Sequence, residues 1–82
     1  MKQVLIVEDS PTELHILRTI MEKNNFVVSV ANNGIEGIEM VKRSPPDIIL
    51  MDVVMPEMNG FKATRALKKD EATSHIPIIM VT

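Results

Sequence analysis

Three acidic residues stand directly after two runs of apolar residues in this sequence. Glu8 and Asp9 follow the run VLIV, and Asp52 follows the run IILM. Continuous apolar runs of this length are typical of strands that are covered on both faces of a parallel sheet. Because the carboxyl ends of parallel strands lie along one edge of a sheet, the three carboxylates converge there if their two strands are neighbours.

Converging carboxylates would have a specific chemical use. They repel one another, and each raises the pKa of the others. A divalent cation removes this conflict, and Mg²⁺ commonly binds one or two carboxylates while keeping several waters and room for a phosphoryl oxygen. Any single acid at a strand end can instead be a helix cap or a turn residue. Because two separate strand ends carry acids here, the sequence favours a magnesium site.

Alternating strands and helices would bring these acids together. Apolar and β-branched runs predict strands over residues 4–7, 26–31, 48–51 and 76–81, and helical spacing predicts helices that begin near residues 10, 35 and 59. This alternation indicates an α/β fold with parallel pairing and right-handed crossovers. No linker, repeat or low-complexity segment divides the chain, so we expect a single domain over residues 1–82.

Local signals support two of these helices. Ser10 can cap the first helix, Pro11 suits its first turn, and Glu13 can close a capping box with Ser10. Gly37 lies inside the second helix, at a cost of about 1 kcal/mol relative to alanine. A glycine at that position indicates that a neighbouring element packs closely against the helix.

Composition argues against several other functions. The chain has 82 residues, of which 45% are hydrophobic and 24% charged, as in an ordinary small globular domain. A net charge of −2 and the absence of Trp and Tyr argue against nucleic acid as a partner, and the absence of cysteine excludes disulfides and thiolate metal sites. No run approaches the ~20 apolar residues needed to cross a bilayer, so we expect a cytoplasmic protein without membrane insertion.

These motifs resemble those of a response-regulator receiver domain, the CheY-like module of two-component signalling. The resemblance is carried by VLIVEDSP, Asn33-Gly34, PDIILMDVVMPEMNG and IPIIMVT, and it runs from Lys2 to Thr82. It implies a flavodoxin-like parallel sheet with the strands in the order 2-1-3-4. The stretches SPTE and KATRALKKDEATSHIPI are similar to small regulators of type IV pilus and chemotaxis-like systems.

The resemblance also implies a role for each acid. Asp52 would accept a phosphoryl group from the phosphohistidine of a sensor histidine kinase or a phosphotransfer protein, which makes the chain a signalling domain and not a turnover enzyme. Asp9 and Asp52 would bind Mg²⁺ directly, together with the backbone carbonyl of Val54. Glu8 would act through a metal-bound water, and the hydroxyl of Thr82 would contact the phosphoryl group.

By comparison with the family, we expect the chain to lack a fourth helix, a fifth strand and a fifth helix, together with a lysine that contacts the phosphoryl group. One sheet face would then be wetted near Ile6, Ile49 and Met80, or near their neighbours on the other face, and the fourth strand would be an open edge. This predicts self-association, domain swapping between chains, or pairing with a second chain that supplies the rest.

Two further functions stand beside phosphotransfer. The main alternative is a Mg²⁺-binding, self-associating interaction module in which phosphorylation of Asp52 is impaired. A nucleotide- or flavin-binding fragment is disfavoured, because VEDSPT stands where a glycine-rich loop would follow the first strand. Val54 is apolar where many receiver domains carry a polar residue, which implies an altered rate of autodephosphorylation without fixing its direction.

Overall fold

The computed structural model describes residues 1–55 and 58–81 of the chain. Strands and helices alternate along it in the predicted order. The elements are β1 (Lys2–Val7), α1 (Pro11–Lys23), β2 (Phe26–Ala31), α2 (Gly34–Arg43), β3 (Ile48–Asp52), α3 (Gly60–Lys69) and β4 (Ile78–Val81).

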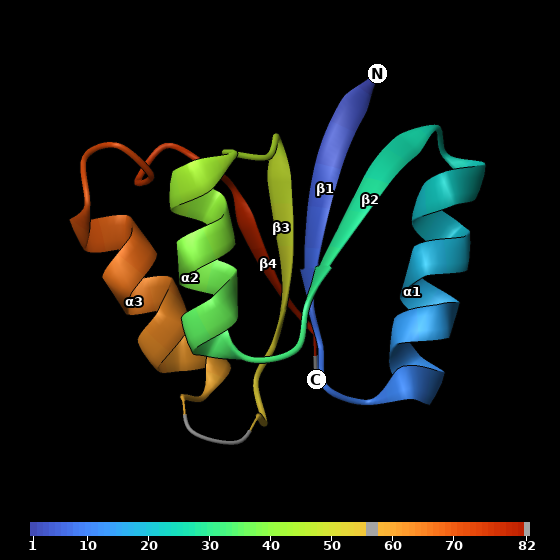
Figure 1. Cartoon of the computed structure of the whole chain (residues 1–82), viewed down its shortest axis with the longest axis horizontal. Coiled ribbons are helices and arrows are strands. Elements are labelled where there is room, and N and C mark those ends of the chain that lie inside the picture. The colour runs from blue at the N-terminus through green and yellow to red at the C-terminus, as the bar shows by residue number, and fades with distance from the viewer. Residues whose placement is uncertain (56–57, 82) are drawn as a thin grey trace.

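The strands form one parallel sheet in the order β2-β1-β3-β4. Helix α1 covers one face of the sheet, and α2 and α3 cover the other (Figure 1). This confirms the predicted flavodoxin-like α/β fold with strand order 2-1-3-4. All the strands point the same way, so their carboxyl ends lie along the lower edge of the sheet in Figure 1, opposite to the N-terminus.

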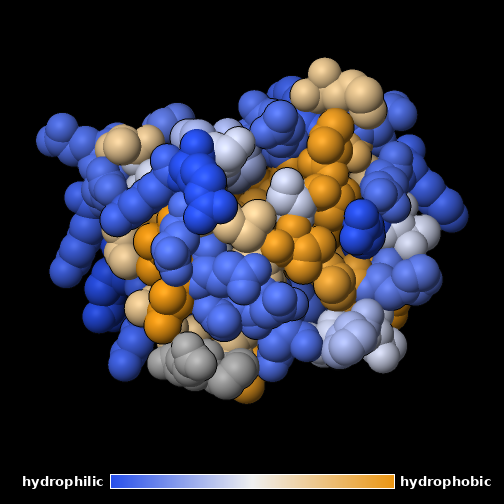
Figure 2. Space-filling view, viewed as in Figure 1, coloured by the Kyte–Doolittle hydropathy of each residue, from blue (hydrophilic) through white to orange (hydrophobic). Residues whose placement is uncertain are grey.

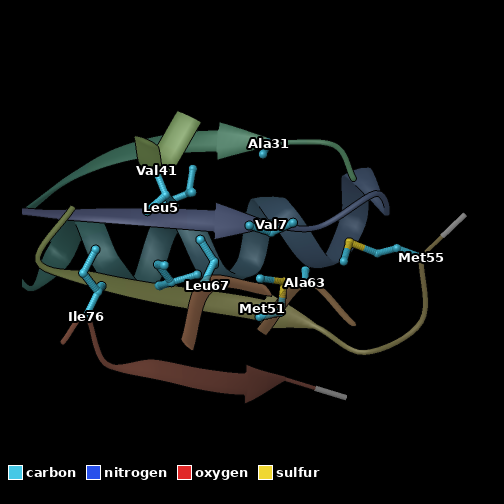
Figure 3. Packing of buried hydrophobic residues seen from close by; sticks show 10 residues of the cluster. Leu5, Val7, Ala31, Val41, Met51, Met55, Ala63, Leu67 and Ile76 are labelled. Carbon is cyan, nitrogen blue, oxygen red and sulfur yellow. The ribbon is translucent and has the colours of Figure 1, made fainter. Parts of the chain in front are cut away.

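Strands β1 and β3 are apolar because helices cover both of their faces. Val4, Ile6 and Leu50 point toward α1 and form the smaller core with its apolar side. The larger core lies between the sheet and the pair α2 and α3, and Figure 3 shows it from close by. Its buried members are Leu5, Val7, Ala31, Val41, Ile49, Met51, Met55, Ala63, Leu67 and Ile76.

Gly37 lies where α2 approaches β1, as its place in the sequence predicts. A Cβ atom at residue 37 would come within 3.0 Å of Cγ2 of Val7. Because that separation is shorter than an ordinary van der Waals contact, a larger residue would push α2 away from the sheet. The prediction of close packing at this glycine is therefore confirmed.

The predicted exposure of Ile6 and Ile49 is wrong. Both side chains are 0% exposed, because α1 covers the face that holds Ile6, and α2 and α3 cover the face that holds Ile49. Met80 is partly buried and packs against the larger core. Exposure of a neighbour on the other face is confirmed for Ile79, which is 50% exposed on the outermost strand.

Both outer strands expose apolar side chains. Over residues 1–55 and 58–81, β4 pairs only with β3, which leaves it as an open edge, as predicted. On the opposite edge, β2 alternates between half-buried and exposed residues, and Val27 is among the exposed ones. Figure 2 shows apolar atoms in a strip over the region where Figure 1 draws β2 and α1.

Three strands differ from their predicted bounds, and β3 does so by ending one residue later than predicted, at Asp52. β1 begins two residues earlier than predicted, because Lys2 and Gln3 pair with Phe26 and Val27 of β2 although their own side chains are exposed. β4 begins at Ile78, two residues later than predicted. Ile76, two residues before the strand, contributes to the core from the connecting segment and not from the strand.

The connection from α3 to β4 is held by side chains that bond to the backbone. The Lys68 Nζ donates to the carbonyls of Ser74 (3.1 Å) and Ile76 (2.7 Å). The hydroxyl of Thr73, which is 1% exposed, donates to the carbonyl of Leu67 (2.6 Å). This connecting segment is thus an ordered turn that places Ile76 in the core.

Helices α1, α2 and α3 contain 13, 10 and 10 residues. In the part of the chain that the structure describes, no helix is both long enough and apolar enough to cross a membrane.

Candidate functional site

Two neighbouring strands deliver acids to the same edge of the sheet. Val7, the last residue of β1, lies opposite Met51 of β3, so Glu8 and Asp52 follow at the same level. The backbone amide of Glu8 donates to the carbonyl of Ala31 in β2 (3.0 Å), which fixes where the chain leaves the sheet. Both acidic side chains are buried, with exposed fractions of 1% for Glu8 and 8% for Asp52. The structure brings these two acids together, as the strand ends predict.

A third carboxylate reaches them from α1. One oxygen each of Glu8, Glu13 and Asp52 lies within 4.8 Å of the other two. The three side chains border a hollow of about 350 Å³ at the carboxyl edge of the sheet. The residues that line it are Glu8, Asp9, Ser10, Glu13, Asp52, Val53 and Val54. None of these described lining residues is basic, so no side chain there neutralises the acids.

Glu8 has one oxygen with a hydrogen bond and one without. Its Oε2 accepts a hydrogen bond from the backbone amide of Ser10 (3.2 Å). Its Oε1 is buried and has no partner among residues 1–55 and 58–81. Burial is the main cause that raises the pKa of Glu8 to about 7; the Ser10 amide lowers the pKa, and Asp52 and Glu13 raise it further.

This environment fits a divalent cation. A buried carboxylate oxygen without a partner has lost its water and gained nothing in return, which destabilises the folded state. Hard oxygen atoms on several carboxylates are the donors that Mg²⁺ and similar ions prefer. A cation in the hollow would supply the missing partner for Glu8 and would separate its charge from that of Asp52.

The backbone after Asp52 is shaped by Gly60. The amide of Gly60 donates to the carbonyl of Val53 (2.9 Å), which folds the loop back over the end of β3. A Cβ atom at residue 60 would collide with the backbone carbonyl of Asp52. Asn59 then begins α3, since its side chain accepts from the amide of Lys62 (2.9 Å). The glycine is required because this loop passes directly against the backbone of Asp52.

The remaining predicted site residues lie in different places. Asp9 lines the hollow, but its side chain is exposed and its carboxylate is not among the three that approach within 4.8 Å of one another. Val54 also lines the hollow, with 79% of its surface exposed. Thr82 lies outside the described residues, as does Pro56 in the loop after Asp52.

Glu13 is a site residue that the sequence reasoning missed. The Ser10 hydroxyl accepts from the amide of Glu13 (3.5 Å), which is half of the predicted capping box. The reciprocal bond is not formed, because the Ser10 amide donates to Glu8 instead. The available signal was spacing: Glu13 follows Asp9 by four residues and lies in the first turn of the helix after the acidic pair.

Comparison with known proteins agrees with this arrangement. A sequence model described as the response regulator receiver domain matches residues 4–82. Protein PilH of Pseudomonas aeruginosa is 50% identical over 82 residues, which are 100% of this chain and 68% of PilH. The polar-differentiation response regulator DivK of Brucella anthropi is 37% identical over 81 residues, which are 99% of this chain and 66% of DivK.

A solved structure has the same fold. It is the receiver domain of a sensor histidine kinase from Pseudomonas aeruginosa PAO1, crystallised with a magnesium ion coordinated in its active site cleft. The TM-score is 0.94 and the sequence identity 30%, over 99% of this chain and 66% of that one. The chain therefore spans about two thirds of the length of the proteins it matches.

Proposed function

Because this chain belongs to the response regulator receiver domain family, we propose that it takes a phosphoryl group onto Asp52 with Mg²⁺ bound beside the acceptor. The donor is the phosphohistidine of a sensor histidine kinase or of a phosphotransfer protein. The domain is a signalling module, and its output depends on the phosphorylated state of Asp52. A cytoplasmic location, where such donors present their phosphohistidine, stays a prediction.

One observation carries the proposal. Glu8 and Asp52 are buried next to each other at the carboxyl edge of the sheet, and Glu8 Oε1 has no partner there within the described chain. Two buried carboxylates without a neutralising side chain are costly for a structural role alone. They are well suited to hold a cation and to present one carboxylate as a nucleophile.

The residues around the hollow would divide the metal-binding role. Asp9 and Asp52 would ligate the cation directly with the carbonyl of Val54, and Glu8 would act through a bound water; all four residues line the hollow. When bound, the cation neutralises charge on the acids and on the phosphoryl oxygens. A contact between the hydroxyl of Thr82 and the phosphoryl group stays a prediction, because Thr82 lies outside the described residues.

Asp52 performs the bond-forming step. An oxygen of its carboxylate attacks phosphorus, the new O–P bond forms as the P–N bond to the donor histidine breaks, and the imidazole leaves with that electron pair. Asp52 is the last residue of β3, and β3 pairs with β1 on one side and with β4 on the other. This pairing restricts the motion of the Asp52 backbone. A fixed nucleophile lowers the entropic cost of reaching the in-line geometry.

The test is phosphorylation by a small phosphodonor. Incubation with acetyl phosphate and Mg²⁺, followed by intact-mass measurement and peptide mapping, should show one phosphoryl group on Asp52. Asp52→Asn should abolish the labelling, and chelation of Mg²⁺ with EDTA should do the same. Asp47→Asn is a matched control: Asp47 is an exposed aspartate that accepts from the amide of Gln3, and an asparagine oxygen can keep that bond. Labelling that survives Asp52→Asn would refute the acceptor assignment.

A self-associating interaction module is the second candidate. The open edge of β4 and the half-exposed Ile79 favour it, because such an edge is a template for pairing with another strand. In that case Mg²⁺ binds while acetyl phosphate leaves Asp52 unlabelled. Sedimentation velocity separates the two, since self-association gives a sedimentation coefficient that rises with concentration and phosphotransfer alone does not.

A further inference from the structure

We infer that Glu13 is a further carboxylate of the cation site, beside Glu8, Asp9 and Asp52, and that it strengthens the binding of the divalent cation from the side of α1. The inference rests on the proposed function, because it concerns the same cation. It adds a residue that the family resemblance does not assign to the metal. The argument depends on three contacts around the start of α1.

The first contact explains why the Glu13 carboxylate is available. At the third position of a capped helix, a glutamate commonly bonds back to the amide of the capping residue. Here that amide, of Ser10, already donates to Glu8 Oε2 at 3.2 Å. Glu8 has therefore taken over half of the capping box, and the side chain of Glu13 lies beside Glu8 and Asp52.

The second contact shows that the group is incomplete without a ligand. Glu8 is 1% exposed, lines the hollow, and its Oε1 has no partner in the described part of the chain. An oxygen of Glu13 and one of Asp52 both lie within 4.8 Å of a Glu8 oxygen. When all three carboxylates are ionised they are acceptors only, with no donor to share, so a cation is the species that would satisfy them.

The third contact is with the hollow itself. Glu13 is exposed on the outer side of the hollow, whereas Glu8 and Asp52 are buried on its inner side. Mg²⁺ normally keeps several waters, and a carboxylate at the rim accepts hydrogen bonds from them. Glu13 therefore acts as a positioning residue that holds the hydrated side of the cation.

The experiment compares two glutamates at equivalent helix positions. Glu13 and Glu36 each donate their backbone amide to the side chain that caps their helix, Ser10 and Asn33, but Glu36 does not line the hollow. Titration calorimetry with MgCl₂ is performed on the wild-type chain, Glu13→Gln and Glu36→Gln. We expect Glu13→Gln to weaken Mg²⁺ binding by about tenfold, as loss of an outer carboxylate does in other metal sites. Glu36→Gln should stay within about twofold of wild type, since distant exposed charges are screened.

A second readout separates a metal role from a capping role. Melting temperatures are measured in EDTA and in excess Mg²⁺. Loss of the helix-terminal charge should lower the melting temperature in EDTA no more for Glu13→Gln than for Glu36→Gln. The rise in melting temperature on adding Mg²⁺ should be smaller for Glu13→Gln alone.

Each result has a distinct meaning. Wild-type affinity in Glu13→Gln, with binding lost in Asp52→Asn, would overturn the role of Glu13 and leave the proposed function standing. Equal losses in Glu13→Gln and Glu36→Gln would also overturn it, since both would then act through helix charge. A wild-type chain that binds no Mg²⁺ at millimolar concentration would overturn the proposed cation site together with this inference.

Discussion

The backbone carbonyl of Asp52 and the Cα of Gly60 lie so close together that a side chain at residue 60 would have no room to begin. The loop between them also closes with the Gly60 amide donating to Val53. The backbone geometry at Asp52 and the start of α3 are thus set by the same contact. A substitution at Gly60 should disturb stability and phosphorylation together.

Gly60→Ala tests this coupling. The new methyl group meets backbone and not a flexible side chain, so the loop must move; we expect a loss of about 2 kcal/mol or more in the free energy of unfolding. Acetyl phosphate labelling of Asp52 should slow as well. Urea denaturation and a labelling time course measure the two effects. Phe61→Ala is the control, because Phe61 is the next residue but is 59% exposed, and it should change stability by less than about 1 kcal/mol.

Glu8 should make stability depend on pH when no cation is bound. Its pKa is raised from 4.5 to about 7, so the folded state holds the Glu8 proton more tightly than the unfolded state does. Its contribution to folding is therefore most favourable below pH 4.5, declines as the pH rises through this window, and is fully lost above about pH 7. The difference between pKa values of 4.5 and about 7 corresponds to about 3 kcal/mol.

Urea denaturation in EDTA across that window measures the effect. Glu8→Gln should remove most of the decline, because the amide does not ionise. Added Mg²⁺ above pH 7 should stabilise the wild-type chain and have a smaller effect on Glu8→Gln. A decline that is unchanged in Glu8→Gln would assign the pH dependence to another group.

Thr73 should matter for stability and not for the site. Its buried hydroxyl donates to the carbonyl of Leu67, and Thr73→Val keeps the shape while it leaves that carbonyl without this donor. We expect a loss of about 1–3 kcal/mol in the free energy of unfolding and an unchanged affinity for Mg²⁺. Thr19→Val is the control. The hydroxyl of Thr19 donates to the carbonyl of His15 at an exposed place, so its removal should lower the free energy of unfolding by less. Equal losses at both positions would contradict this account.

Ile79→Lys tests the open edge of β4. A charged side chain on an edge strand opposes pairing with another strand, so any concentration-dependent sedimentation should decrease. Ile35→Lys is the control, because Ile35 is 43% exposed but lies on α2 and away from the edge. If both substitutions reduce association equally, general charge and not the edge would be responsible.

The fold could be predicted because its determinants are local in the sequence. Continuous apolar runs mark β1 and β3, whose faces are both covered, and the helices between them follow from spacing and capping residues. The start of β4 could not be predicted in this way, whereas its last residue, Val81, was predicted correctly. Whether Ile76 belongs to the strand depends on Lys68 and Thr73, which fold the preceding turn so that Ile76 enters the core before the strand begins.

The candidate site could also be predicted only in part. Glu8 and Asp52 could be paired from their places at two strand ends, since parallel topology carries both to one edge. Glu13 could not be predicted as part of the site, because the direction of its side chain depends on whether Glu8 or Glu13 accepts the hydrogen bond from the Ser10 amide. The exposure of Ile79 in place of Ile6 and Ile49 likewise depends on where each helix lies over the sheet.

The shallow burial of α1 has a kinetic consequence. No residue of this helix is fully buried, so few contacts oppose its local unfolding, and its amides should exchange with deuterium sooner than those of β1 and β3. A cation bound to Asp52 and Glu13 would tie the first turn of α1 to the end of β3. Amide exchange in α1 would then be slower when the cation is bound than when it is absent, so the exchange rates of this helix would report occupancy of the site.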